Sequence, residues 1–266
     1  MKNDILLGGY IPSDSFLHRL DPRTKLVGLV AFLAAVFWSP VASGVAVAAL
    51  PAAILAGLSR TGWKIWFLAF RRFALMLAVV PALNVFFNTQ GTPVVVLQRE
   101  LPFTWEGLET GFVFTSQIAL AIVSALVLTF TTSPADLSRA LELFLRPLKR
   151  FKVPVEDLGM ILLLAMRFVP LLQQELYATM DAQKSRGVEF SRGSLSTRAG
   201  NLVALLSPVM TGALRRADLL ALAMTARGFR PGGTRTQFRP LEFRSADGLA
   251  FCAILLFTAG RLALLP

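Results

Sequence analysis

The sequence has very little of the chemistry that most enzymes use. Its 266 residues include one cysteine, Cys252, and one histidine, His18. These two side chains cannot supply a disulfide framework or a cluster of cysteine and histidine ligands for a metal. A serine–histidine–aspartate site would have to use His18, which lies in a basic N-terminal stretch far from any Gly-x-Ser-x-Gly sequence. We therefore expect no catalytic residues and no metal site.

A phosphate-binding loop is missing as well. No segment has the pattern Gly, four residues, Gly-Lys and then Ser or Thr, whose backbone N–H groups would hold the phosphates of ATP. We expect no bound cofactor, so any energy for work has to come from another protein.

Charged residues are scarce. They make up 16% of the chain, against 55% hydrophobic residues, and the mean hydropathy is +0.61. A soluble domain carries about 25% charged residues, so the balance indicates a membrane protein. The net charge of +11 is also typical of nucleic-acid-binding proteins, but the basic residues here lie beside long apolar runs. Because there is no zinc-finger spacing or basic-aromatic sheet motif, we expect no nucleic-acid partner.

Four apolar stretches are candidates for membrane spans. They cover residues 26–58, 66–87, 108–130 and 249–265. A spanning helix needs about 20 apolar residues, so the first stretch is too long for one span and short for two. The sequence Trp38-Ser39-Pro40 interrupts it, which favours two short helices. The sequence thus predicts an all-α fold with about five transmembrane helices.

The distribution of lysine and arginine predicts the topology. Basic residues precede the first stretch and lie between the first and second, and seventeen more lie in residues 132–245, whereas 88–107 contains only Arg99. With five spans, each strongly basic segment faces the cytoplasm, in agreement with the positive-inside rule. We expect a multi-pass protein of a prokaryotic cell membrane, with its N-terminus inside and its C-terminus outside. A cleaved signal peptide is disfavoured because acidic residues interrupt the candidate leader.

Residues 132–245 are predicted to form a cytoplasmic region of about three amphipathic helices. The first begins at Ser133, a candidate N-cap followed by Pro134, and places Leu137, Leu141, Leu145 and Leu148 on one face. The second and third cover about 155–186 and 198–227. Charged residues interrupt their apolar runs, which favours helices at the membrane face over additional spans. The predicted domains are thus residues 1–131, the cytoplasmic region 132–245, and a final span within 246–266.

The second and third amphipathic helices share two features. Each contains a proline, Pro170 or Pro208, which we expect to bend it. Each also ends in a small residue, an arginine and a glycine: Ser185-Arg186-Gly187 and Ala226-Arg227-Gly228. One such end is an ordinary helix terminus, since a basic residue complements the helix dipole and glycine forms the cap. Two of them suggest instead a pair of anchors that dock into two similar acidic grooves.

Four long segments stand out: YIPSDSFLHRLDPRTKL (10–26), TTSPADLSRALELFLRPLKRFKVP (131–154), LLLAMRFVPLLQQELYATMDAQKSRG (162–187) and RRADLLALAMTARGFRPGGTRT (215–236). As a set they resemble the T-component of energy-coupling factor transporters, the transmembrane scaffold of ABC-type vitamin and metal importers. The resemblance implies a non-catalytic subunit that joins two cytoplasmic ATPases to a substrate-binding S-component. It also implies that the two coupling helices dock on the ATPases through Ser185-Arg186-Gly187 and Ala226-Arg227-Gly228. Of the two scaffold types in that family, shared among S-components or dedicated to one, we favour the shared type.

The N-terminal sequence LHRLDPRTK (17–25) has two interpretations. In one it is a basic segment at the membrane surface, where Asp21-Pro22 starts a helix. In the other, Asp21 and Arg23 hold the coupling region against the membrane helices.

Two other functions compete with a scaffold. An intramembrane enzyme needs clustered His, Asp or Glu residues, which the predicted spans lack. A secondary transporter that acts alone predicts polar residues at mid-membrane, whereas the polar residues here gather in 132–245.

Overall fold

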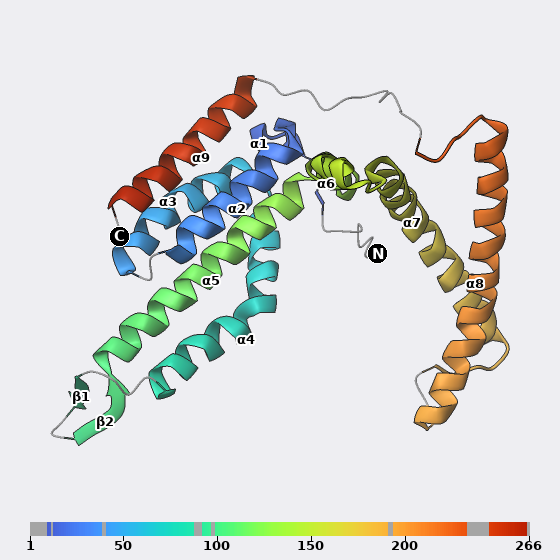
Figure 1. Ribbon diagram of the computed structural model, residues 1–266. Helices are drawn as coiled ribbons and strands as arrows, with labels where there is room; N and C mark the ends of the chain where they lie inside the picture. Colours follow the sequence, from blue (N-terminus) through green and yellow to red (C-terminus); the bar gives the residue numbers. More distant parts are fainter. Residues whose placement is uncertain are drawn as a thin grey trace. The chain divides into compact units, whose positions relative to one another are not determined.

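The computed structural model describes residues 10–11, 13–38, 41–87, 92–96, 99–190, 194–232 and 245–264. In these residues every regular element is a helix except for one short hairpin, which confirms the predicted helical fold class (Figure 1). In chain order the elements are α1 (Phe16–Arg19), α2 (Pro22–Trp38), α3 (Ala42–Leu58), α4 (Trp63–Phe87), β1 (Pro93–Val96), β2 (Arg99–Thr104), α5 (Trp105–Thr131), α6 (Pro134–Leu145), the 3₁₀ helix η1 (Arg146–Phe151), α7 (Val155–Ser185), α8 (Leu195–Ala226) and α9 (Ser245–Leu264).

The chain forms two compact units. The first unit comprises Met1–Leu137 with Arg239–Pro266, and the second unit comprises Ser138–Phe238. The helices α2, α3, α4, α5 and α9 belong to the first unit, and each lies at one of the predicted spans. The apolar stretch 26–58 is divided as expected, because α2 ends at Trp38 and α3 begins at Ala42.

Two helices of the first unit are long and apolar enough to cross a bilayer. They are α4, with 25 residues, and α5, with 27. At about 1.5 Å per residue both exceed the roughly 30 Å of a hydrocarbon core. No residue of α4 is buried, and large apolar side chains such as Leu75 and Phe87 are exposed. One face of α4 packs against α5, and the exposed apolar side chains on the rest of the helix are suited to lipid rather than to water.

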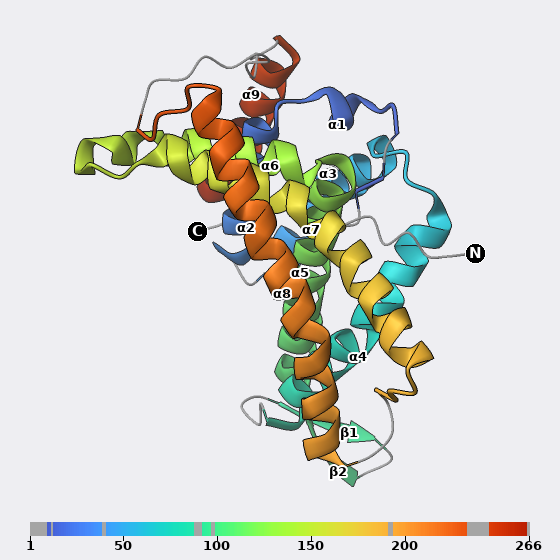
Figure 2. The same cartoon turned by 90° about the vertical axis from the view of Figure 1, so that its right-hand side faces the viewer.

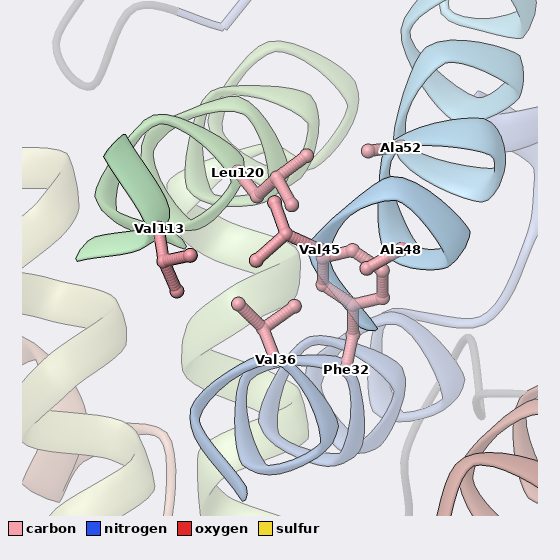
Figure 3. Close-up of a cluster of buried hydrophobic side chains, with 7 residues drawn as sticks. All are labelled: Phe32, Val36, Val45, Ala48, Ala52, Val113 and Leu120. Carbon is pink, nitrogen blue, oxygen red and sulfur yellow. The ribbon is translucent and has the colours of Figure 1, made fainter. Parts of the chain in front are cut away.

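The core of the first unit lies between α2, α3 and α5. Figure 3 shows Phe32 and Val36 of α2 against Val45, Ala48 and Ala52 of α3 and Val113 and Leu120 of α5. The Gln117 side chain of α5 is also fully buried, and its Nε2 donates to the Val36 carbonyl at 2.9 Å. This bond gives a side-chain donor to a carbonyl in the last turn of α2, where helices commonly use donors from outside their own backbone.

Helix α9 packs against α2, although more than 200 residues separate them in sequence. Gly28 lies at this contact, and a Cβ there would lie 2.7 Å from Ile254 Cδ1, so the Ile254 side chain would have to shift. The stacked rings of Phe32 and Phe257, with centroids 5.9 Å apart, extend the contact.

The hairpin between α4 and α5 was not predicted. β1 and β2 are antiparallel, with Val95 opposite Glu100 and Val96 opposite Arg99. Three successive valines, 94–96, favour an extended strand because their side chains are branched at Cβ. The hairpin leads into α5, whose first turn is capped by the Thr104 hydroxyl, which accepts from the Gly107 N–H at 3.2 Å.

The second unit is built around α7 and α8, helices of 31 and 32 residues that pack against each other in opposite directions (Figures 1 and 2). Both helices continue unbroken through their prolines, Pro170 and Pro208. A proline removes one backbone hydrogen bond from the helix interior. The structure thus shows that each helix is continuous through its proline. The bend that we expect at these positions stays a prediction.

Candidate docking site: two arginine-tipped helix ends

The C-terminus of α7 is closed by a glycine in the left-handed conformation. Arg186 is the C-cap, and Gly187 follows with φ of 85°. The Gly187 N–H donates to the Lys184 carbonyl at 2.9 Å, and the Val188 N–H donates to the Gln183 carbonyl at 3.1 Å. This pair of bonds is a Schellman motif, which satisfies carbonyls that a helix end leaves without partners.

The C-terminus of α8 has the same construction. Arg227 is the C-cap, and Gly228 follows with φ of 77°. The Gly228 N–H donates to the Thr225 carbonyl at 2.9 Å, and the Phe229 N–H donates to the Met224 carbonyl at 3.0 Å. The helix-end interpretation of both tripeptides is thus correct at the level of the backbone, and it leaves both arginine side chains available for a further role.

The arginines are presented between small neighbours. Both guanidinium-bearing residues are exposed, and so are the residues that flank them. The Ser185 hydroxyl donates to the Asp181 carbonyl at 3.0 Å. Its proton is therefore used inside α7, and its exposed oxygen is left as an acceptor beside Arg186.

Each tip is also tied to the other helix. The segment after Arg186 is held by Asn201 of α8, whose Nδ2 donates to the Glu189 carbonyl at 2.9 Å. The segment after Arg227 is held by Asp157 of α7, whose carboxylate accepts from the Gly232 N–H at 3.0 Å. The two tips therefore lie at opposite ends of one antiparallel helix pair, and each is anchored to the early turns of the neighbouring helix.

An ion pair joins α7 and α8 between the tips. Glu175 Oε2 lies 2.9 Å from Arg216 Nη2, with both side chains mostly shielded from water. Gly212 makes room for this pair, because a Cβ there would lie 2.5 Å from Glu175 Oε1. The pair is a direct polar contact between the two helices.

The chemistry available at this site is recognition rather than catalysis. A guanidinium stays charged, and its planar donors can pair with a carboxylate or with the carbonyls of a helix end. Within the described residues, no three His, Cys, Asp or Glu side chains come together as metal ligands.

Asp21 and Arg23 lie at the start of α2 in the first unit. The Asp21 carboxylate accepts from the Arg23 N–H at 2.8 Å, and the Asp21 N–H donates to Asp247 Oδ1 of α9 at 2.7 Å. Both aspartates are buried. Asp21 thus lies at the start of α2 and joins its N-terminus to that of α9. Both interpretations of the segment 17–25 stay predictions.

Lys25, one turn further along α2, makes the contact between α2 and the end of α5. Its Nζ donates to the Thr131 carbonyl at 2.9 Å and approaches the Thr132 hydroxyl at 3.3 Å. It also interacts electrostatically with Asp136, Asp247 and Asp21. We call Lys25 and these partners the junction cluster.

Sequence reasoning missed several of these residues. In the sequence, Lys25 and Asp247 are simply charged residues beside apolar stretches. Asp157 and Asn201 carry no signal beyond a polar side chain early in a helix. Their partners lie 75 and 12 residues away in the chain, so only the packed structure identifies them.

Known proteins with related sequences match nearly the whole chain. Residues 13–238 match the CbiQ family, described as cobalt transport protein. The energy-coupling factor transporter transmembrane protein EcfT of Streptococcus equi is 36% identical over 253 residues, which cover 95% of this chain and 93% of its own. The proteins of the same name from Heliobacterium modesticaldum and Listeria innocua are each 40% identical over 93% of this chain, and 92% and 93% of their own lengths are covered.

The family match covers far more than half of the chain, and the alignments with these relatives cover more than nine-tenths of both sequences. The chain therefore belongs to the CbiQ family of membrane transport proteins, which includes the transmembrane components of energy-coupling factor transporters.

Proposed function

We propose that this protein is the transmembrane scaffold of an energy-coupling factor importer and that Arg186 and Arg227 are its two docking points for cytoplasmic ATPases. ATP binding closes the ATPase pair and moves the two arginine-tipped helices relative to each other. The apolar faces of α7 and α8 carry this movement to a membrane S-component, which binds the substrate. The substrate is a vitamin or a metal ion, held by that other subunit.

The duplicated helix end is the observation that carries this proposal. Two Schellman caps place two exposed arginines in the same backbone conformation, at opposite ends of one helix pair. A partner with two similar subunits offers two similar sockets, one for each arginine. The ion pair between Glu175 and Arg216 supports the transmission step, because it links the helices between their two tips.

The proposed topology follows the charge distribution. Residues 132–245 form the cytoplasmic coupling region, residues 1–131 supply the first four spans, and 246–266 supply the last. The N-terminus lies inside and the C-terminus outside. The protein itself then needs no ATP site, because the partner ATPases hydrolyse ATP.

An apolar cavity supports the assignment of substrate binding to another subunit. It has a volume of about 320 Å³ and lies in the first unit between α2, α3, α5 and α9. Its wall is mostly hydrocarbon, with side chains such as Phe32, Leu55 and Ile254. A charged or strongly polar solute would lose its hydration there without enough partners in return, which argues against a carrier that acts alone.

The test is co-purification of the scaffold with the two ATPases. Substitution of Arg186→Glu together with Arg227→Glu should abolish assembly, because each change replaces a cation with an anion at an acidic socket. Loss of one anchoring partner typically costs about 2–5 kcal/mol of binding, or roughly 30-fold or more. Each single variant should therefore weaken assembly measurably.

The matched control replaces one exposed arginine in the interior of each helix, with Arg167→Glu in α7 and Arg215→Glu in α8. It makes the same change in net charge away from the tips and should leave the complex intact. A complex that survives the Arg186/Arg227 double substitution would overturn the docking proposal.

A further inference from the structure

Helix α6 exposes apolar residues rather than polar ones. Three of its residues are exposed, and all three are apolar: Leu137 at 36%, Leu141 at 46% and Phe144 at 41% of full exposure. They are spaced at i, i+4 and i+7, so they form one stripe along the helix. On a protein surrounded by water, a surface helix shows the opposite pattern.

The other residues of α6 are buried or partly buried. Ser138 and Ala140 are buried, and Arg139 and Glu142 are partly buried. The Glu142 side chain lies at Gly159 of α7, in the space that a Cβ there would occupy. Glu142 thus faces α7, whereas the three residues of the stripe are exposed.

The stripe continues into η1, where it is joined by positive charge. Leu148 is 39% exposed, and Phe151 is 81% exposed. Four cations lie in the same seven residues, 146–152, and the one ion pair described among them joins Lys149 to Glu156. Exposed aromatic and aliphatic side chains beside clustered lysine and arginine are typical of segments that bind the surface of an anionic membrane.

The position in the chain places this segment near a bilayer. Helix α5, which is long enough to span a membrane, ends at Thr131, and α6 begins three residues later at Pro134. A helix of 12 residues is about 18 Å long. Basic side chains influence membrane topology when they lie within about 15–20 residues of the end of a span. The cations of η1 lie within that distance of the end of α5.

We propose that α6 and η1 form an interfacial anchor. The stripe of Leu137, Leu141, Phe144, Leu148 and Phe151 lies in the boundary between headgroups and acyl chains. Arg146, Arg150 and Lys152 contact the phosphates of anionic lipids. The anchor holds the beginning of the second unit at the membrane surface.

A protein partner fits this surface less well than lipid does. Lysine is depleted in protein–protein interfaces, whereas Lys149 and Lys152 flank the most exposed aromatic residue of the segment. An acidic protein surface would satisfy the cations but would leave the adjoining apolar stripe without a match. An anionic bilayer supplies both: negative charge at the headgroups for the cations, and hydrocarbon just below them for the apolar stripe.

The anchor can be tested on the full chain, without partners, in lipid nanodiscs. Cys252→Ser removes the native cysteine, and nitroxide labels are then placed at Phe144→Cys or at Phe151→Cys. Lys184→Cys, exposed near one arginine tip, serves as a reference in water. Collision with oxygen, which concentrates in lipid, is compared with collision of a water-soluble nickel chelate. We expect labels at 144 and 151 to favour oxygen and the label at 184 to favour the chelate.

The role of the charges has its own matched pair of variants. Arg146→Gln with Arg150→Gln should bring the label at 151 toward water in discs that contain phosphatidylglycerol. Arg198→Gln with Arg215→Gln removes the same charge from α8 and should have no effect. Equal oxygen preference with and without phosphatidylglycerol would overturn the headgroup contact.

Labels at 144 and 151 that favour the chelate in these discs would overturn the anchor. If the labels were shielded from the chelate only after partner subunits were added, the stripe would instead be assigned to a protein interface. Because no ATPase is present in the main measurement, failure of the anchor and failure of arginine docking are distinguishable.

Discussion

Arg186 and Arg227 have nearly the same backbone conformation although they end different helices. Their φ and ψ angles are −86° and 6° for Arg186, and −88° and 10° for Arg227. Each is followed by a glycine with positive φ, which closes the cap. The same pair of backbone hydrogen bonds therefore positions both arginines. The conformation of each tip depends on the glycine that follows the arginine.

The first prediction concerns these glycines. Gly187→Ala or Gly228→Ala should destabilise its helix end by about 1–2 kcal/mol, because an L-residue with a Cβ is strained in the left-handed region. A Cβ would meet no atom within 4 Å at either position, so the strain is in the backbone alone. Assembly with the ATPases should weaken less than with Arg→Glu at the same tip.

The control for this prediction is Gly200→Ala. Gly200 lies inside α8, and a Cβ there also meets nothing within 4 Å. In a helix interior alanine is favoured over glycine by about 1 kcal/mol. Thermal unfolding should therefore shift upward for Gly200→Ala and downward for the two cap variants; a common direction for all three would contradict the cap geometry.

The second prediction concerns the ion pair between α7 and α8. A double-mutant cycle of Glu175→Gln and Arg216→Gln should give a coupling energy of about 0.5–1 kcal/mol, because the pair is only partly exposed. The coupling should fall as salt is added. Chemical unfolding of the four proteins of the cycle measures it.

Lys184 and Asp181 provide the comparison pair. They lie 3.5 Å apart on α7 with side chains 52% and 74% exposed. Water screens such a pair, so the same cycle at these positions should give a coupling energy near zero. Equal coupling in the two cycles would show that Glu175 and Arg216 have no special role at the α7–α8 contact.

The third prediction concerns Lys25 in the junction cluster. Lys25→Met removes the donor to the Thr131 carbonyl and leaves three neighbouring aspartates without that cation. A lost hydrogen bond to a charged group costs about 1.5–3 kcal/mol. We expect a lower unfolding temperature and faster proteolysis at 131–133, where α5 gives way to α6.

Lys64→Met is the control for that loss. Lys64 is an exposed cation in the first turn of α4, so its removal makes the same change in charge and side-chain type. It should leave both readouts close to those of the unsubstituted protein. Equal losses from both lysines would assign the effect to net charge rather than to the junction.

The fourth prediction concerns Pro170 and Pro208. Proline inside a helix leaves one carbonyl without its backbone donor and makes local bending easier. If the helices deform there during transport, Pro170→Ala and Pro208→Ala should reduce uptake while the ATPases still co-purify. Unchanged uptake in both variants would exclude the hinge.

Much of the fold follows from hydrophobic pattern alone. The division of 26–58 into α2 and α3 was predictable because Trp38-Ser39-Pro40 interrupts a run that is too long for one span. The N-cap at Ser133 was predictable for a local reason, since its hydroxyl accepts from the Asp136 N–H three residues later. The hairpin between α4 and α5 was missed because three valines are too short a signal beside two long helices.

The sequence by itself determined the class of protein, the number of long helices and the two arginine tripeptides. These properties depend on composition and on neighbours within a few residues, as hydropathy, capping and charge do. Tertiary structure alone decided that Lys25 contacts the end of α5 and that Asn201 and Asp157 tie down the arginine tips. It also decided that α6 turns its apolar stripe outward. Such contacts depend on which faces of distant helices meet, and no local pattern in the chain encodes that choice.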